Sequence, residues 1–162
     1  SNLASYKFYY TEKGKIKTHR SLFSLEITFQ NQIKNVKLML KDRNKRSQVP
    51  FKQEAADSEI FLLCFAVDDK ASLRYGHKRF FQQIREHFDK EPVLVVGMKE
   101  DRRKGLNLNG LSCFFVDDLT VRNICEDLGA VGYVTCTVSD VNSVRSVLER
   151  AVGIVLDERN KN

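Results

Sequence analysis

The sequence has no apolar run long enough to cross a membrane, and its four cysteines form no CxxC pair. A helix that spans a bilayer needs about 20 predominantly apolar residues. The first residues, Ser1-Asn2-Leu3-Ala4-Ser5, lack the charge, apolar stretch and cleavage site of a secretory signal. Widely spaced cysteines argue against a disulfide framework and against a zinc site. We therefore expect a cytoplasmic protein with reduced thiols, no metal site and no stable membrane insertion.

The composition is that of a soluble globular chain, with 42 % hydrophobic and 30 % charged residues among 162. No repeat, low-complexity tract or linker interrupts it, which predicts one domain over residues 1–162. The net charge of +6 arises in the N-terminal third, where residues 1–50 hold eleven Lys and Arg against three acids. This excess favours an acidic protein partner. Nucleic-acid binding is the weaker interpretation, because the aromatics of residues 6–10 suit a strand better than a base-stacking surface.

The hydrophobic periodicity predicts an α/β fold. Two alternating segments indicate an antiparallel hairpin with a loop of about five residues, and two continuous apolar runs are typical of strands buried on both faces of a parallel sheet. The six predicted strands are residues 6–10, 22–30, 36–40, 60–67, 93–97 and 133–137.

Three helical periods lie between and after the later strands. The first has an apolar stripe that includes Leu73, Ile84 and Phe88. Asp117 or Asp118 starts the second, which Gly129 ends, and Asp140 caps the last. Alternation of strand and helix from residue 60 onward predicts crossover helices. We expect a three-layer, mostly parallel six-stranded sheet with one antiparallel hairpin strand.

Two motifs at the ends of predicted strands carry a family resemblance. They are Val96-Gly97-Met98-Lys99-Glu100-Asp101 and Gly129-Ala130-Val131-Gly132-Tyr133-Val134-Thr135-Cys136. With the strand that precedes them and Ala71-Ser72-Leu73, this ordered series resembles the small GTPase superfamily, closest to its Rho branch. The resemblance implies the small GTPase fold over most of the chain.

The resemblance also implies a phosphate-binding loop, GxxxxGK[ST], which this sequence lacks. Its one Gly-Lys pair is Gly14-Lys15. Ile16 follows this pair where the motif has Ser or Thr, and Tyr9 occupies the position of the first glycine, five residues before Gly14. About twenty residues precede the hairpin, whereas the family places a strand, the loop, a helix and a switch segment there. We therefore expect the first helix and the phosphate loop to be missing. Residues 105–116 are one candidate to cover the apolar surface that such a loss would leave beside the last helix.

The second switch of the family is altered as well. Its Asp-x-x-Gly-Gln motif reads Asp42-Arg43-Asn44-Lys45-Arg46 in this chain. Asp42 is kept, but Lys45 replaces the glycine that meets the terminal phosphate. Arg46 replaces the glutamine that orients the attacking water. These replacements argue against hydrolysis.

The base-reading motif is partly kept. Lys99 and Asp101 match the family pattern, but Met98 stands where Asn or Thr is usual. We expect no catalytic residue and no cofactor. The sequence is similar in this respect to the pseudoGTPase domains of large multidomain Rho GTPase-activating proteins, which implies a protein-interaction, scaffolding or regulatory role. The alternative is an atypical small GTPase that holds guanine nucleotide weakly through Asp42, Lys99 and Asp101.

Overall fold

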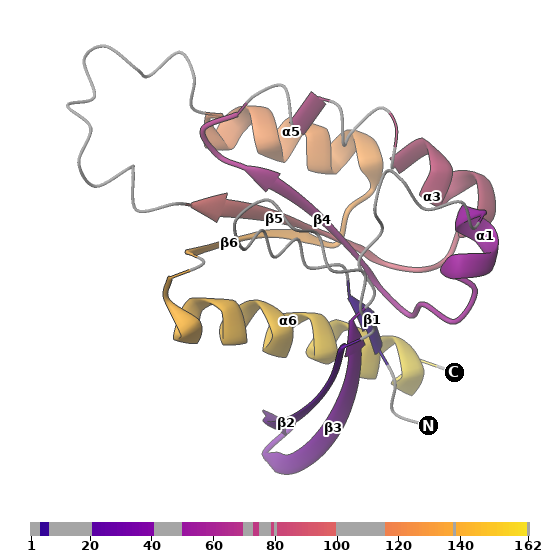
Figure 1. Ribbon diagram of the computed structural model, residues 1–162, viewed down its shortest axis with the longest axis vertical. Helices are drawn as coiled ribbons and strands as arrows, with labels where there is room; N and C mark the ends of the chain where they lie inside the picture. The colour runs from indigo at the N-terminus through magenta and orange to yellow at the C-terminus, as the bar shows by residue number, and fades with distance from the viewer. Residues whose placement is uncertain are drawn as a thin grey trace.

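The strands in the described part of the chain form two hydrogen-bonded sheets of three. The computed structural model describes residues 4–6, 21–40, 50–69, 73–74, 79, 81–99, 116–137 and 139–161. One sheet has the order β1-β3-β2 and the other the order β4-β5-β6 (Figure 1). Their bounds are Ala4–Tyr6 for β1, Ser21–Phe29 for β2, Gln32–Leu40 for β3, Phe61–Ala66 for β4, Val93–Lys99 for β5 and Gly132–Thr137 for β6.

Helices cover both faces of the parallel sheet β4-β5-β6. One side carries the 20-residue helix α6, and the other carries α5, α3 and the short α1 (Figure 1). Their bounds are Phe51–Glu54 for α1, Gln82–His87 for α3, Asp118–Leu128 for α5 and Val141–Asn160 for α6. The expected layered α/β architecture is therefore confirmed.

The central strand β5 supplies side chains to two separate hydrophobic cores. Leu94 and Val96 belong to the core beneath α6, whereas Val93 and Val95 belong to the core shared with α3 and α5. All four are fully buried. Successive side chains of a strand point to opposite faces, so a continuous apolar run is what a strand covered on both sides requires.

Local signals in the sequence located both ends of α5 and the start of α6 correctly. The carboxylate of Asp117 accepts a hydrogen bond of 2.7 Å from the Thr120 amide, and Gly129 ends α5 with φ of 62°. The carboxylate of Asp140 accepts bonds from the Asn142 and Ser143 amides at the start of α6. Of the stripe expected on the first helix, Leu73, Ile84 and Phe88 are buried in one core.

The expected five-residue hairpin loop is wrong. Strands β2 and β3 pair out to Phe29 and Gln32, which leaves a two-residue turn at Gln30 and Asn31. Both turn residues have positive φ, 49° and 61°. This is the type I′ geometry that matches the right-handed twist of a hairpin. The turn lacks the glycine that usually marks this geometry in a sequence, so its length was overestimated.

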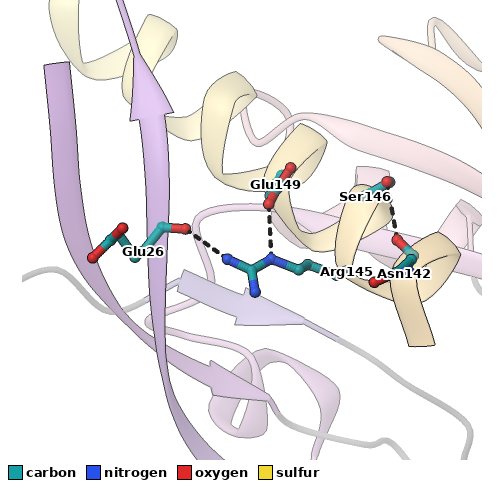
Figure 2. A network of polar contacts seen from close by, with 5 residues as sticks. All are labelled: Glu26, Asn142, Arg145, Ser146 and Glu149. Atoms are coloured by element: carbon teal, nitrogen blue, oxygen red, sulfur yellow. Dashed lines mark hydrogen bonds and ion pairs between the residues drawn. The ribbon is translucent and has the colours of Figure 1, made fainter. Parts of the chain in front are cut away.

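Helix α6 holds the hairpin at its edge. Arg145 donates a hydrogen bond of 3.1 Å from Nη2 to the main-chain oxygen of Glu26 on β2, and its Nε lies 3.0 Å from Oε1 of Glu149 (Figure 2). An outward-facing carbonyl of an edge strand is thereby satisfied by a charged donor, one way in which proteins protect exposed strand edges. Val36 and Leu38 of β3 pack into the α6 core.

The first strand begins at Ala4, two residues before the start predicted for residues 6–10, and it lies at the predicted side of the hairpin. It runs from Ala4 to Tyr6, parallel to β3, with Cα atoms close to those of β4. The described residues contain no ladder that joins β1 to β4. A single continuous sheet of six strands therefore stays a prediction, as does the extent of this strand over residues 7–10, which lie outside the described residues.

The segment expected to cover the surface beside α6 lies outside the described residues except for its end. Val116 is buried in the core of α3 and α5, on the face opposite α6, and its amide donates to the Val67 oxygen at 2.8 Å. At this residue, therefore, the expectation that residues 105–116 cover the α6 side is wrong. The described residues include no helix that is both long and apolar enough to cross a membrane.

The left-handed turn makes a direct prediction about stability. Replacing Asn31 by valine should lower the free energy of unfolding by about 1–2 kcal/mol, because a β-branched residue is poorly tolerated in this conformation. Ile33→Val, on an exposed strand position two residues away, is the matched control and should change little. Urea denaturation of both variants measures the difference. Equal midpoints for Asn31→Val and the unmodified protein would show that the turn is not left-handed.

Candidate functional site

The parallel strands β4, β5 and β6 end at one edge, and this is where open α/β sheets bind ligands. The register places Ala66 beside Met98, Met98 beside Cys136, and Lys99 beside Thr137. The order of the strands therefore brings Met98 and Lys99, the first residues of the base-reading motif, next to the end of β6. Of the positions singled out in the sequence, Lys99 is the last residue of β5, whereas Asp42, Lys45, Arg46 and Asp101 lie outside the described residues.

Met98 packs inward at this edge. Its side chain is partly buried against the α6 core, on the same face of β5 as Leu94 and Val96. A thioether is apolar and adapts its shape to fill irregular gaps in a core. Met98 therefore fills space in the core at the end of β5.

Gly97 leaves room for a close approach from the neighbouring strand. A Cβ atom built on Gly97 would lie 2.6 Å from the hydroxyl oxygen of Tyr133 and 3.0 Å from Cγ1 of Val67. Tyr133 also stacks on Phe65, with ring centroids 6.0 Å apart and planes 22° from parallel. The tyrosine thus fills the α5 side of β5 directly below the candidate site. The sequence contained both residues, but only their register, with Tyr133 paired to Val95, reveals the contact.

The turn after β6 is closed by hydrogen bonds of its own. Ser143 Oγ accepts a bond of 2.9 Å from the Thr137 amide, and it donates toward the oxygens of Thr137 and Asp140 at 3.0 and 2.8 Å. The side chain of Asp140 accepts hydrogen bonds from amides in the first turn of α6. Protein groups therefore satisfy both the amide of Thr137 and the N-terminus of α6. Sequence reasoning found the Asp140 cap and missed Ser143, although a serine three residues after a cap is a recognisable signal.

The thiols of Cys125 and Cys136 lie in environments that disfavour their charged forms. Burial raises the pKa of the Cys136 thiol. It also raises the pKa of the Cys125 thiol, which is less completely buried. A raised pKa keeps these groups as thiols at neutral pH, which suits packing rather than nucleophilic chemistry. Within the described ranges no group of three or more His, Cys, Asp or Glu side chains could hold a metal ion.

Comparison with known proteins identifies the family to which this chain belongs. The model of the Ras family matches residues 16–157. The chain belongs to the Ras family. A second finding comes from individual relatives: the chain is 29 % identical over 110 residues to the Rho-related GTP-binding protein RhoD of Homo sapiens, covering 65 % of this chain and 52 % of that protein.

Two further Ras-family relatives come from distant organisms. The Ras-like GTP-binding protein RHO1 of Entamoeba histolytica is 27 % identical over 107 residues, covering 64 % of this chain and 46 % of that protein. The GTP-binding protein RHO4 of Saccharomyces cerevisiae is 22 % identical over 102 residues, covering 63 % and 34 %. The matches thus span about half the length of these Ras-family relatives or less. The resemblance to Ras and Rho proteins that the sequence motifs indicate is confirmed at the level of the family.

The contact between Gly97 and Tyr133 predicts a specific double-mutant result. Gly97→Ala should destabilise this Ras-family domain by about 1–3 kcal/mol, as overpacking of a core does. In a Tyr133→Phe background the same change should cost less, because the nearest clashing atom has gone. Thermal or urea unfolding of the two single variants and the double variant measures the coupling. Strictly additive effects would mean that the hydroxyl does not limit the space at Gly97.

Proposed function

We propose that this Ras-family domain is a pseudoGTPase that neither binds guanine nucleotide stably nor hydrolyses GTP, and that acts as a protein-interaction or regulatory module. The observation that carries the proposal is the inward packing of Met98. The family pattern has Asn or Thr at this position, where an amide or hydroxyl contributes to the nucleotide site. A methionine packed against the α6 core supplies no hydrogen-bond donor there.

Features of the sequence at other positions agree with the proposal. Lys45 and Arg46 replace the glycine and glutamine of the second switch, and the Gly14-Lys15 pair lacks the hydroxyl residue that follows in a phosphate loop. Phosphate and magnesium contacts anchor most of the charge of a bound nucleotide. The loss of these groups would leave a base contact from Asp101 unable to retain it.

The turn after β6 agrees as well. Ser143 and Asp140 hold this turn by hydrogen bonds within the protein. These bonds join the end of β6 to the start of α6 through groups of the chain itself. A domain of this kind would present one fixed surface in place of a nucleotide-driven cycle.

The context we propose is a cytoplasmic one, inside a large multidomain Rho GTPase-activating protein, whose pseudoGTPase domains this sequence resembles. The partner is a protein with an acidic surface, since residues 1–50 hold eleven basic residues against three acids. A basic field of this kind raises the rate of association with an acidic partner.

A second candidate function rests on the end of β5. Lys99 lies beside Thr137 in the register, next to the position where the family reads the base, and the relatives are named as GTP-binding proteins. Under this alternative, Asp42, Lys99 and Asp101 hold guanine nucleotide weakly. The two functions differ in a measurable way.

The deciding experiment is a nucleotide assay on the purified protein. We expect no guanine nucleotide in the supernatant after acid denaturation and no change in melting temperature with GDP or GTP and Mg²⁺. A ligand at 100 times its Kd adds about 2.7 kcal/mol to the stability of the native state. That is a shift of about 5–10 °C for a domain of this size. Human RhoD, treated in the same way, is the positive control.

Variants of the base-reading motif separate the two functions. If the domain is a pseudoGTPase, Lys99→Ala and Asp101→Ala melt at the same temperature with and without nucleotide, as the unmodified protein does. Stoichiometric nucleotide, or a melting shift that either variant abolishes, would replace the pseudoGTPase proposal by the weak GTPase. A basic residue away from the site, Lys52 on the exposed side of α1, supplies the matched control Lys52→Ala.

A further inference from the structure

Part of the backbone of β3 faces a side of the sheet where the described residues provide no partner strand. β1 lies on this side, but among the described residues its ladder with β3 begins at Ala4 opposite Leu38. Residues 33–36 of β3 therefore extend beyond β1 and pair only with β2 among the described residues, and the amide of Lys37 lies where the ladder with β1 begins. An exposed length of strand edge is a template for a further strand.

The hairpin turn determines which backbone groups point toward this side. A two-residue turn makes Phe29 and Gln32 a hydrogen-bonded pair, and such pairs alternate with non-bonded ones along the ladder. Ile33, Asn35 and Lys37 fall on the non-bonded rungs. Their amides and carbonyls thus point away from β2, toward the side of β1. The bond from Arg145 to the oxygen of Glu26, which pairs with Asn35, confirms that this rung directs its groups outward.

A cavity of about 140 Å³ lies beside this edge, between the hairpin and the C-terminal half of α6. Apolar cavities of about 150 Å³ accept a ligand the size of benzene, so this one has room for a single aliphatic side chain. Its floor is formed by valines that are buried in the α6 core. The lining residues are Lys34, Asn35, Val36, Val152, Val155, Leu156 and Arg159.

The charge at the rim of the cavity selects among possible occupants. The charge of Arg159 is already paired with a carboxylate, because its guanidinium donates hydrogen bonds of 2.6 and 2.7 Å to the two carboxylate oxygens of Glu59. Lys34 is half-buried, with Nζ 5.5 Å from the ring centroid of Phe29, and in the described part of the chain no carboxylate pairs with it. A half-buried ammonium beside an apolar hollow favours an acidic side chain next to an aliphatic one.

We propose that residues 33–37 of β3 bind an extended segment of a partner protein, which adds as a strand and places an aliphatic side chain in the cavity and a carboxylate beside Lys34. Backbone groups on alternate residues provide the hydrogen bonds, and the cavity provides the selectivity, as in other strand-addition interfaces. The added strand also covers Ile33, which is 70 % exposed on the opposite face. This inference rests on the proposed interaction role and names its surface and the chemistry of the partner.

The probe is a peptide that presents this chemistry in either strand direction: acetyl-Thr-Glu-Thr-Leu-Thr-Glu-Thr-amide. Its leucine and both glutamates project from one face, so a carboxylate lies beside Lys34 whichever way the strand runs. In a titration followed by amide NMR, we expect saturable shifts and slowed hydrogen exchange at Ile33, Asn35 and Lys37. Peptides with Lys for Glu, or Asp for Leu, should bind at least about tenfold more weakly.

Proline variants on the two edges of the hairpin provide a matched pair. Asn35→Pro removes an outward amide beside the cavity, whereas Thr28→Pro removes one on the far edge of β2; neither amide belongs to the ladder between the strands. Asn35→Pro should weaken peptide binding about tenfold and Thr28→Pro should not. Leu156→Trp, which fills the cavity from a half-buried position, should weaken binding without loss of the fold, as checked by thermal melting.

Three results would overturn the proposal. They are the absence of saturable shifts at 1 mM peptide (roughly the Kd limit of a useful recognition site), equal binding by the two proline variants, and protection of the same amides by self-association of the free protein. The last would assign the edge to a second copy of the chain. Peptide binding and nucleotide binding are measured separately. A negative peptide result therefore does not contradict the pseudoGTPase proposal, and detection of bound nucleotide does not change the interpretation of the peptide titration.

Discussion

The burial of β5 on both faces is the constraint on which the rest of the structure depends. Residues 93–96 are fully buried, and alternate side chains enter the core under α6 and the core under α3 and α5. A strand with two apolar faces cannot lie at a surface, so a helix layer is needed on each side. The hairpin is then fixed because Val36 and Leu38 join the same α6 core, and Arg145 ties its edge to the helix.

The same constraint extends into the candidate site. β5 continues its alternation through Gly97 and Met98, so one position faces Tyr133 and the next faces the α6 core. Packing therefore uses the positions from which a base-reading loop would begin. In our proposal this is the physical link between fold and function: the scaffold of the Ras family is retained because its cores are intact, while the polar groups that would hold a nucleotide have given way to side chains that pack.

The hairpin shows a different balance between stability and accessibility. Its inner face is buried against α6, one edge accepts a hydrogen bond from Arg145 at Glu26, and the other edge is paired only over its last residues in the described part of the chain. A cavity remains between β3 and the C-terminal half of α6. The surface that we assign to a partner is thus a consequence of how the hairpin is anchored.

The sequence by itself determined the features that depend on neighbours along the chain, and only the tertiary structure decided those that depend on register and on contacts between distant elements. Apolar runs located β4 and β5, the cap of Asp117 and the terminal Gly129 located α5, and ordered motifs identified the Ras family. Periodicity, capping and motif spacing act over a few residues, so these signals are local. The same holds for Lys45 and Arg46, whose departure from the switch motif is visible in the order of residues alone.

The hairpin turn needed the paired strands, because Gln30 has no intrinsic preference for positive φ and adopts it under the twist of the two strands it joins. The approach of Tyr133 to Gly97, the bond from Arg145 to Glu26, and the cavity between β3 and α6 likewise join residues far apart in sequence. No local pattern encodes such meetings, because they are set by how whole elements pack.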